Sequence, residues 1–246
     1  MRRGKLGFWL RLAVIVLKPL LTVFTRRRWL GREHVPATGG VILCFNHVSY
    51  LDPPVVAHFV YDLPRIPRFL AKESLFRLPL IGRVVRGAGQ IPVHRGTAGA
   101  SESLREARHA LERGDAVIIY PEGTVTRDRG LWPMTGKTGA ARLALETGAP
   151  IIPVAQWGAQ RLYDGRTRKV RLCPRTPVGL VAGPPVDLSP WAGRPPTGPV
   201  LHAATEAIMC RLRDQLAEIR GETPPATFHT PTEQPPLTVV RDGDGR

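Results

Sequence analysis

Short apolar runs that alternate with helix-like stretches constrain the fold of this chain most strongly. Runs rich in β-branched residues and bounded by glycine or proline predict strands at residues 40–45, 68–72, 89–93, 115–120, 150–155 and 178–183. Stretches 96–114 and 135–149 carry apolar residues at helical spacing and contain glycine stop signals. This alternation predicts an α/β fold with a mixed, partly parallel sheet flanked by helices, whose ligands bind beyond the C-terminal strand ends.

The N-terminal stretch combines a long apolar segment with basic residues. Residues 1–32 contain no acidic residue, and residues 8–24 are mostly apolar apart from Arg11 and Lys18. A membrane-spanning helix needs roughly 20 apolar residues, so this one is marginal. Arg11 and Lys18 fall on one side of a helix, opposite a wide apolar face, and Pro19 predicts a kink or break. The pattern favours an N-terminal membrane-interface helix, or an amphipathic helix packed on the protein's own core.

The chain therefore divides into three predicted parts. Residues 1–33 form a membrane-associated helical segment, residues 34–221 form the α/β domain with a last helix at 198–221, and residues 222–246 form a Pro-rich disordered tail. The side chains expected to contact the membrane are Trp9, Arg11, Lys18, Arg26, Arg27 and Arg28.

The overall charge points to an anionic partner. Among the 246 residues, Lys and Arg exceed Asp and Glu by 15, which fits nucleic acid, an anionic membrane or phosphorylated ligands. No motif-defined or aromatic-studded basic surface is evident, so no nucleic acid partner is expected. Cys44, Cys173 and Cys210 are far apart, which predicts neutral thiols in a reducing compartment and neither a zinc site nor a disulfide framework.

A histidine and an aspartate follow the first buried run in the stretch VILCFNHVSYLDPP, residues 41–54. On a continuous helix His47 and Asp52 would lie about 140° apart, so they meet only if the chain turns between them. Asp52 and Pro53 fit the N-cap and first position of a helix, which predicts strand, loop and helix. A paired carboxylate would make His47 a general base. The same residues also fit a plain helix cap and a loop histidine.

Three further stretches offer groups that a phosphate monoester needs. Each follows a predicted strand or precedes a predicted helix, where backbone N–H groups are available for anions. Their candidate substrate-binding residues are Arg95, Glu122, Gly123, Thr124, Arg127 and Lys137. The GKT triplet at Lys137 is not a nucleotide-binding P-loop, because Leu131 stands where that motif needs glycine.

The order of these motifs resembles the glycerolipid acyltransferase family, which includes bacterial 1-acylglycerol-3-phosphate acyltransferases. The family's N-H-x4-D motif matches Asn46, His47 and Asp52, and its second motif matches residues 89–95. Its E-G-T-R motif matches residues 122–124, and its apolar fourth motif matches residues 151–154. The resemblance covers roughly residues 25–215. One departure is Val125, which replaces the arginine of the third motif, and Arg127 is the nearest substitute.

The resemblance implies transfer of a fatty acyl group from acyl-CoA or acyl carrier protein to the hydroxyl of 1-acylglycerol-3-phosphate, giving phosphatidic acid in phospholipid synthesis. His47 would take the hydroxyl proton, Asp52 would orient it, and backbone N–H groups of the same turn would stabilise the oxyanion. Arg95, Glu122, Gly123, Thr124, Arg127 and Lys137 would hold the phosphate and glycerol of the acceptor, without metal or cofactor.

The partners implied are membrane lipids, the lysophospholipid and the thioester donor. The location implied is the cytoplasmic face of the cell membrane, peripheral or through a single N-terminal anchor, with the oligomeric state open. Three alternatives remain. They are acylation of another acceptor, such as glycerol-3-phosphate, another lysolipid or a glycolipid; hydrolysis of the thioester; and a non-catalytic membrane-association protein that does not depend on His47.

Overall fold

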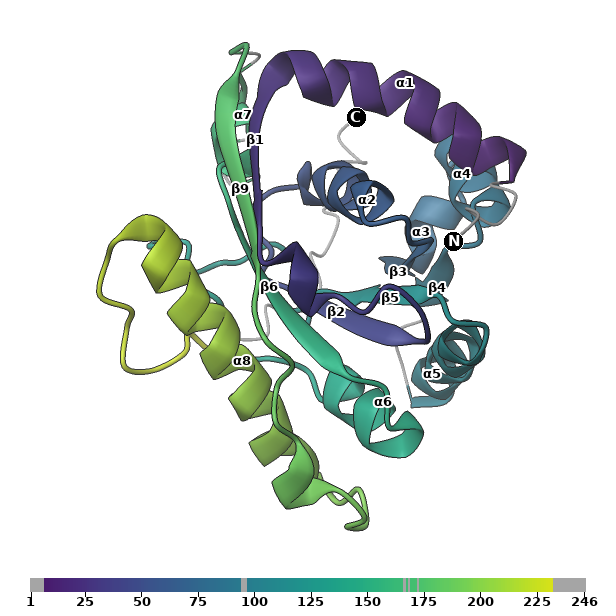
Figure 1. Cartoon of the computed structure of the whole chain (residues 1–246), viewed down its shortest axis with the longest axis vertical. Coiled ribbons are helices and arrows are strands. Elements are labelled where there is room, and N and C mark those ends of the chain that lie inside the picture. The colour runs from purple at the N-terminus through teal and green to yellow at the C-terminus, as the bar shows by residue number, and fades with distance from the viewer. Residues whose placement is uncertain (1–6, 94–96, 166, 168, 172, 232–246) are drawn as a thin grey trace, which may run out of the picture.

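The protein is built around a seven-stranded sheet that helices cover on both faces (Figure 1). The computed structural model describes residues 7–93, 97–165, 167, 169–171 and 173–231. The strands of the sheet run in the order β1-β9-β6-β2-β5-β3-β4. Their bounds are β1 Thr25–Leu30, β2 Val41–Phe45, β3 Pro67–Lys72, β4 Ile91–Val93, β5 Ala116–Ile119, β6 Ile151–Trp157 and β9 Thr176–Ala182.

The sheet is mixed, as the sequence predicts. Strands β6, β2, β5, β3 and β4 run parallel to one another. Strand β9 is antiparallel to β6 and pairs in parallel with the edge strand β1. Each of the six predicted strands overlaps an observed one. The parallel strands bring their C-terminal ends to one edge, so the segments that follow β2, β3 and β5 lie together.

Helices cover the two faces of the sheet. Helices α1 (Phe8–Phe24) and α2 (Asp52–Asp62) lie on one side, and α5 (Thr97–Glu112), α6 (Gly139–Thr147) and α8 (Gly198–Arg220) lie on the other (Figure 1). The short helices α3 (Glu73–Phe76) and α4 (Ile81–Gly87) connect β3 to β4. Helix α7 (Ala159–Leu162), strands β7 (Tyr163–Asp164) and β8 (Lys169–Val170), and 3-10 turns at Arg32–His34 and Ser189–Trp191 complete the described elements.

The side chains of β2 alternate between two hydrophobic cores. Ile42 and Cys44 pack with residues of α5, α6 and α8, whereas Leu43 and Phe45 pack with α2. This alternation follows from the period of two along a strand. Because β2 is buried on both faces, it forms the fixed base from which the next loop projects.

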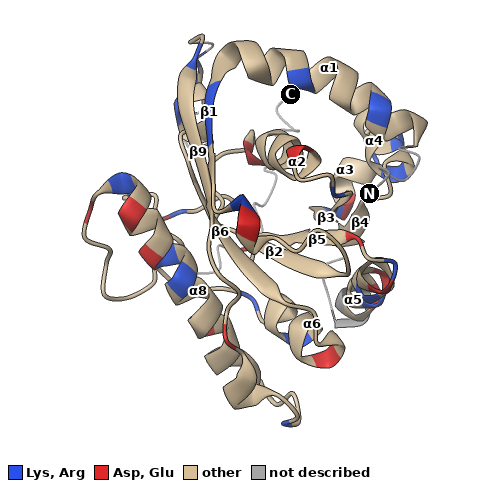
Figure 2. Cartoon of the chain, in the orientation of Figure 1, with Lys and Arg blue, Asp and Glu red and all other residues tan. Residues whose placement is uncertain are grey.

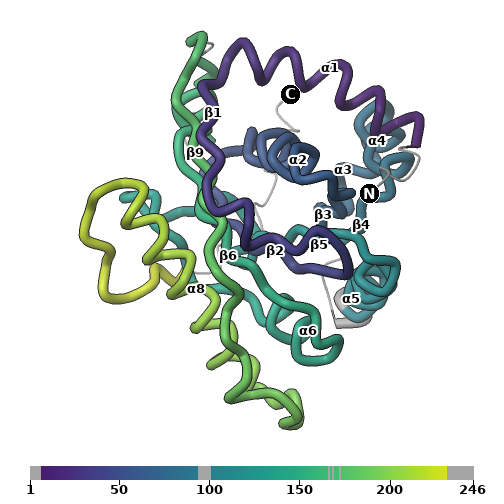
Figure 3. The backbone as a smooth tube through the Cα atoms, in the orientation of Figure 1, coloured from purple at the N-terminus to yellow at the C-terminus, as the bar shows by residue number. Residues whose placement is uncertain are grey.

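The N-terminal segment differs from its prediction in two respects. Helix α1 continues through Pro19 as one element, so the chain does not break there. Residues 25–30, predicted to belong with the membrane segment, form β1 and pair with β9 in the central sheet, as the trace in Figure 3 shows. In the described ranges no helix has the length and hydropathy that crossing a membrane requires.

Part of the tail predicted to be disordered is packed on the domain. Thr135 donates its backbone N–H to the carbonyl of His229 at 3.0 Å, and Phe228 packs against the core beneath α8. Arg213 also lies over the Phe228 ring at 5.2 Å from the centroid. One aromatic anchor and a backbone pairing hold residues 222–231, while 232–246 lie outside the described residues.

Candidate active site

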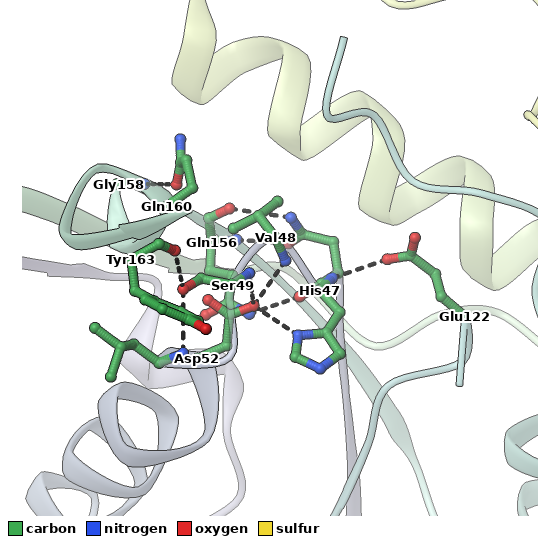
Figure 4. Close-up of polar contacts among 11 residues, drawn as sticks. His47, Val48, Ser49, Asp52, Glu122, Gln156, Gly158, Gln160 and Tyr163 are labelled. Atoms are coloured by element: carbon green, nitrogen blue, oxygen red, sulfur yellow. Dashed lines mark hydrogen bonds and ion pairs between the residues drawn. The ribbon is translucent and has the colours of Figure 1, made fainter. Parts of the chain in front are cut away.

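The loop after β2 brings His47 and Asp52 together. Oδ2 of Asp52 lies 2.7 Å from Nδ1 of His47, and it also accepts the backbone N–H groups of Val48 at 2.7 Å and Ser49 at 2.8 Å (Figure 4). Asp52 is the first residue of α2, not its N-cap as the sequence predicts, because Leu51 occupies the cap position. The carboxylate points back into the loop and closes the turn that the sequence requires.

The surroundings of the pair suit a base held in one orientation. Asp52 is completely buried, while the His47 side chain is 13 % exposed. Burial raises the pKa of Asp52, and the hydrogen bonds and charge of His47, together with the two backbone donors, oppose that rise. The Asp52 carboxylate accepts two backbone N–H groups and also accepts the N–H of Nδ1 of His47. Nε2 is therefore the ring nitrogen that can take a proton from a substrate.

Glu122 holds the backbone of His47 from the other side. One carboxylate oxygen accepts the N–H of His47 at 2.8 Å (Figure 4). The other accepts the N–H of Met134 at 3.0 Å. Thr126 donates its own N–H to the carbonyl of His47 at 2.7 Å. Burial raises the pKa of Glu122 to about 8, although both backbone donors and Thr126 act to lower it. The carboxyl group is committed to the backbone, so it fixes the loop.

A buried amide pair fixes the end of β2 to the end of β6. Nδ2 of Asn46 donates to the carbonyl of Gln156 at 3.0 Å, and Oδ1 of Asn46 accepts the N–H of Gln156 at 2.7 Å. The side chain of Gln156 returns a third bond to the Asn46 carbonyl at 2.6 Å. Ser49 also donates its hydroxyl to the carbonyl of Tyr163 at 2.7 Å (Figure 4). Together these bonds leave the loop little freedom.

Tyr120 connects the histidine to a neighbouring cavity. Its ring stacks on the imidazole of His47, with 4.2 Å between the ring centroids and 24° between the planes. Burial and, to a smaller degree, the charge of Asp52 raise the pKa of Tyr120 well above its ordinary value, so the phenol is neutral. The same side chain forms part of the wall of the cavity.

The cavity has a volume of about 400 Å³ and lies where the C-terminal ends of the parallel strands meet the start of α6. Its apolar wall includes Leu70, Leu104 and Ile119, and its cations are Lys72, Lys137 and Arg142. An apolar pocket with a few convergent charges suits an amphiphile that carries an anionic group.

The predicted substrate-binding residues divide into two groups. Gly123 and Lys137 line the cavity, and the φ of Gly123 is +70°, where a Cβ would lie 3.0 Å from Cε of Lys137. Thr124 is half-buried and Arg127 is exposed, and neither is part of the cavity wall. Arg95 lies outside the described residues. Glu122 contacts the backbone of His47, as described above.

Sequence reasoning missed Lys72, Arg142 and Tyr120. Lys72 ends β3 and Tyr120 follows the last residue of β5, so their positions at strand ends were a signal that could have found both. Arg142 lies one helical turn into α6 and reaches the cavity only through the tertiary fold.

The backbone donors expected to stabilise an oxyanion are already used. Within the turn, the N–H of His47 binds Glu122, those of Val48 and Ser49 bind Asp52, and that of Leu51 binds the Ser49 hydroxyl at 3.1 Å. These four amides hold the loop around His47 and Asp52, so the oxyanion donors predicted for this turn are not among them.

Comparison with known proteins identifies the family of this chain. The Acyltransferase family profile matches residues 26–157, which include the whole of the His47–Asp52 loop and Glu122. The chain belongs to the Acyltransferase family. It is 31 % identical over 134 residues to the 1-acyl-sn-glycerol-3-phosphate acyltransferase of Borreliella burgdorferi, covering 54 % of this chain and 52 % of that protein.

Two further relatives extend the comparison. The 1-acyl-sn-glycerol-3-phosphate acyltransferase of Limnanthes douglasii is 34 % identical over 164 residues, covering 65 % of this chain and 54 % of that protein. The chain thus spans about half the length of these curated relatives. The crystal structure of the 1-acyl-sn-glycerophosphate acyltransferase PlsC from Thermotoga maritima shares the fold, with a TM-score of 0.65 at 24 % identity. That likeness covers 87 % of this chain and 80 % of the other.

Proposed function

We propose that this protein transfers a fatty acyl group from a thioester to the free hydroxyl of 1-acylglycerol-3-phosphate, which yields phosphatidic acid. The observation that carries the proposal is the 2.7 Å contact between Nδ1 of His47 and Oδ2 of the buried Asp52. The family and the names of the curated relatives support the same reaction class.

The reaction balances with these two residues alone as its acid–base machinery. Nε2 of His47 takes the proton of the acceptor hydroxyl while the hydroxyl oxygen bonds to the thioester carbonyl carbon. Asp52 stabilises the imidazolium that forms. Collapse of the tetrahedral intermediate breaks the carbon–sulfur bond, and the imidazolium returns its proton to the leaving thiolate. The donor is acyl-CoA or acyl carrier protein, and the chemistry needs no metal or cofactor.

The cavity is the proposed site of the acceptor. Lys72, Lys137 and Arg142 bind the phosphate, and the apolar wall receives part of an acyl chain. Tyr120 borders the cavity and stacks on His47, which puts the cavity beside the imidazole. Arg95, which lies outside the described residues, and Thr124 and Arg127, which lie outside the cavity wall, are proposed as a second line of contacts around the glycerol.

The outward face of α1 is the proposed membrane contact. Phe8, Ile15, Val16, Leu20 and Val23 are between 51 % and 70 % exposed, and the opposite face of the helix packs on α2. An apolar face of this kind is stable when a lipid interface covers it. We place the protein on the cytoplasmic face of the cell membrane, bound peripherally through this helix.

The side chains predicted to contact lipid take different positions in the fold. Arg11, Arg26 and Arg28 are exposed. Lys18 instead pairs with Asp62 at 3.3 Å, and Arg27 contacts His58 at 2.8 Å. Trp9 packs on Gly87 of α4. The apolar face of α1 and the three exposed arginines therefore carry the proposed membrane contact.

A second acceptor is the main rival. Val125 stands in the position where the resembled motif has arginine, and its side chain is only 8 % exposed, while Arg127 points to solvent. Loss of that cation would suit a lysolipid or glycolipid without a terminal phosphate. Glycerol-3-phosphate is also possible on the same chemistry.

An acceptor panel tests the proposal. The purified protein is incubated with a labelled acyl donor, either acyl-CoA or acylated acyl carrier protein. The acceptor is lysophosphatidate, glycerol-3-phosphate, lysophosphatidylcholine or monoacylglycerol, and His47→Ala serves as the control. The expected result is acylated product with lysophosphatidate that the variant does not form. If acylated product formed only with another acceptor, the proposed acceptor would be wrong. If the acyl thioester were consumed without any acylated product, the protein would be a thioester hydrolase.

A further inference from the structure

The connection between β3 and β4 exposes a second group of apolar side chains. Leu75 is 38 % exposed, Leu78 42 %, Leu80 69 % and Ile81 48 %. Single exposed leucines are normal on a soluble protein. Four such side chains between residues 75 and 81 form a patch, which usually marks a surface that meets another apolar surface.

The patch is held rigidly outward. Phe76 is buried, and the carbonyl of Phe76 accepts a hydrogen bond from Nη1 of Arg86. Gly82 packs so closely on the same carbonyl oxygen that a Cβ would lie 2.2 Å from it, and its N–H donates to Leu78 at 2.7 Å. Leu78 and Leu80 are therefore exposed because α3 and α4 fold tightly, and their exposure belongs to the folded state.

The patch is continuous with the N-terminal helix. Trp9 of α1 lies against Gly87, where a Cβ would approach Cδ1 of the indole to 1.9 Å. Helix α4 is seven residues long, so Ile81 at its other end lies about 10 Å from this contact. The 75–81 segment therefore lies near the N-terminal end of α1, and Figure 1 shows α4 beside that end of the helix.

The charges around the patch are mainly positive. Arg77, Arg83 and Arg86 are exposed, and Glu73 forms an ion pair with Arg77 at 2.6 Å. Figure 2 shows Lys and Arg on both α1 and α4. Apolar side chains set among exposed cations complement a bilayer that carries anionic headgroups.

We propose that the 75–81 segment is a second membrane-contact element that inserts into an anionic bilayer beside α1. The inference rests on the proposed lipid-acylating function and extends it. The connection begins after Lys72 and returns to the sheet before Val93, and both residues line the cavity. Two contacts fix the orientation of the protein, so they present the cavity to the lipid, whereas one helix alone would let it rotate.

Vesicle flotation of the purified full-length protein tests this contact without any acyl transfer. The vesicles contain phosphatidylethanolamine with phosphatidylglycerol, and the double variant Leu80→Glu, Ile81→Glu is compared with wild type. The expected result is at least about a tenfold fall in the partition coefficient, because two apolar side chains can no longer enter the bilayer. The single variants Leu80→Glu and Leu30→Glu form the charge-matched comparison, since each adds one negative charge and Leu30 is 43 % exposed at the end of β1, away from α1.

Several outcomes would overturn the proposal. These are wild-type protein that does not float, a double variant that floats like wild type, or an equal loss in Leu30→Glu. If the double variant lost acyl transfer from acyl carrier protein but floated like wild type, the patch would be a binding surface for the donor protein. The proposed contact with the bilayer would then be wrong. The folded state is checked by circular dichroism. Failure of the proposed function would appear separately in the acceptor panel, because flotation needs no substrate.

Discussion

Nδ1 of His47 and Oδ2 of Asp52 lie 2.7 Å apart because the carboxylate at the start of α2 points back into the loop that precedes it. The same oxygen accepts two backbone N–H groups, so Asp52 orders the loop and orients the imidazole together. The geometry of the loop and the orientation of the imidazole therefore depend on one carboxyl group.

Asp52→Asn should lower kcat by roughly a thousandfold while KM changes little. The amide keeps the shape and can still accept backbone N–H groups, but it no longer stabilises an imidazolium at His47. Steady-state acylation kinetics measure both constants. His47→Ala should show a loss at least as large with an unchanged circular dichroism spectrum, and an Asp52→Asn enzyme with wild-type kcat would contradict the role of the pair.

Tyr120→Phe should keep kcat within about threefold, whereas Tyr120→Leu should lower it by tenfold or more. The aromatic ring stacks on His47 at 4.2 Å, and phenylalanine preserves that contact while leucine does not. Kinetics of both variants, with thermal unfolding as a check on the fold, decide between ring and hydroxyl. A large loss of kcat in Tyr120→Phe would show that the phenolic oxygen of Tyr120 is required, and not only its ring.

Glu122 should make the protein less stable as the pH rises. The pKa of its carboxyl group is about 8 in the folded protein and 4.5 in an ordinary site, so the folded state binds more protons between these values. The contribution of Glu122 to the free energy of unfolding therefore falls as the pH rises through that window. Denaturant unfolding at pH 6 and pH 8.5 should show this fall in wild type.

Glu122→Gln is the matched variant for that measurement, because glutamine does not titrate. Its unfolding free energy should change less between the two pH values than that of wild type. Parallel pH profiles for the two proteins would show that burial does not control this carboxyl group.

The strand pattern was predictable, whereas the outermost strand was not. Runs such as residues 41–45 and 151–154 are apolar throughout because both faces of their strands are buried, and this feature is local in sequence. Strand β1 reads TRRRWL and has mostly exposed side chains, so no local pattern marks it. Its pairing with β9, far along the chain, determines its conformation.

The residues of the site also divide into those that local sequence predicts and those that only the fold brings together. His47 and Asp52 could be predicted because their spacing and the strand before them are local features. Glu122 carries an acidic side chain in a motif with basic residues, which suggested substrate contact. Only the fold shows that both of its oxygens bind backbone N–H groups. Lys72 and Arg142 come from separate elements that the fold brings to one cavity.

Lys72→Ala and Lys137→Ala should each raise KM for lysophosphatidate by roughly tenfold and leave KM for a non-phosphorylated acceptor unchanged. Both side chains line the cavity, and a charge-assisted hydrogen bond to phosphate is of this size. Arg194→Ala is the control of equal charge, because Arg194 is exposed and does not line the cavity. A larger rise in KM in Arg127→Ala than in either lysine variant would show that the phosphate binds near Arg127 and not in the cavity.

Ile15→Glu should reduce recovery of the protein with anionic vesicles without unfolding it. Ile15 is 69 % exposed on the outward face of α1, so its replacement disturbs lipid contact and no packed side chain. Removing the whole helix is a poorer test, because Leu17 and Leu21 cover α2 and their loss would expose a new apolar groove. Leu30→Glu is the matched control, since it adds the same charge and Leu30 is 43 % exposed at the end of β1, away from α1. Equal loss of vesicle recovery in the two variants would indicate a general effect of charge, and unchanged recovery in Ile15→Glu would exclude the outward face of α1 as the contact.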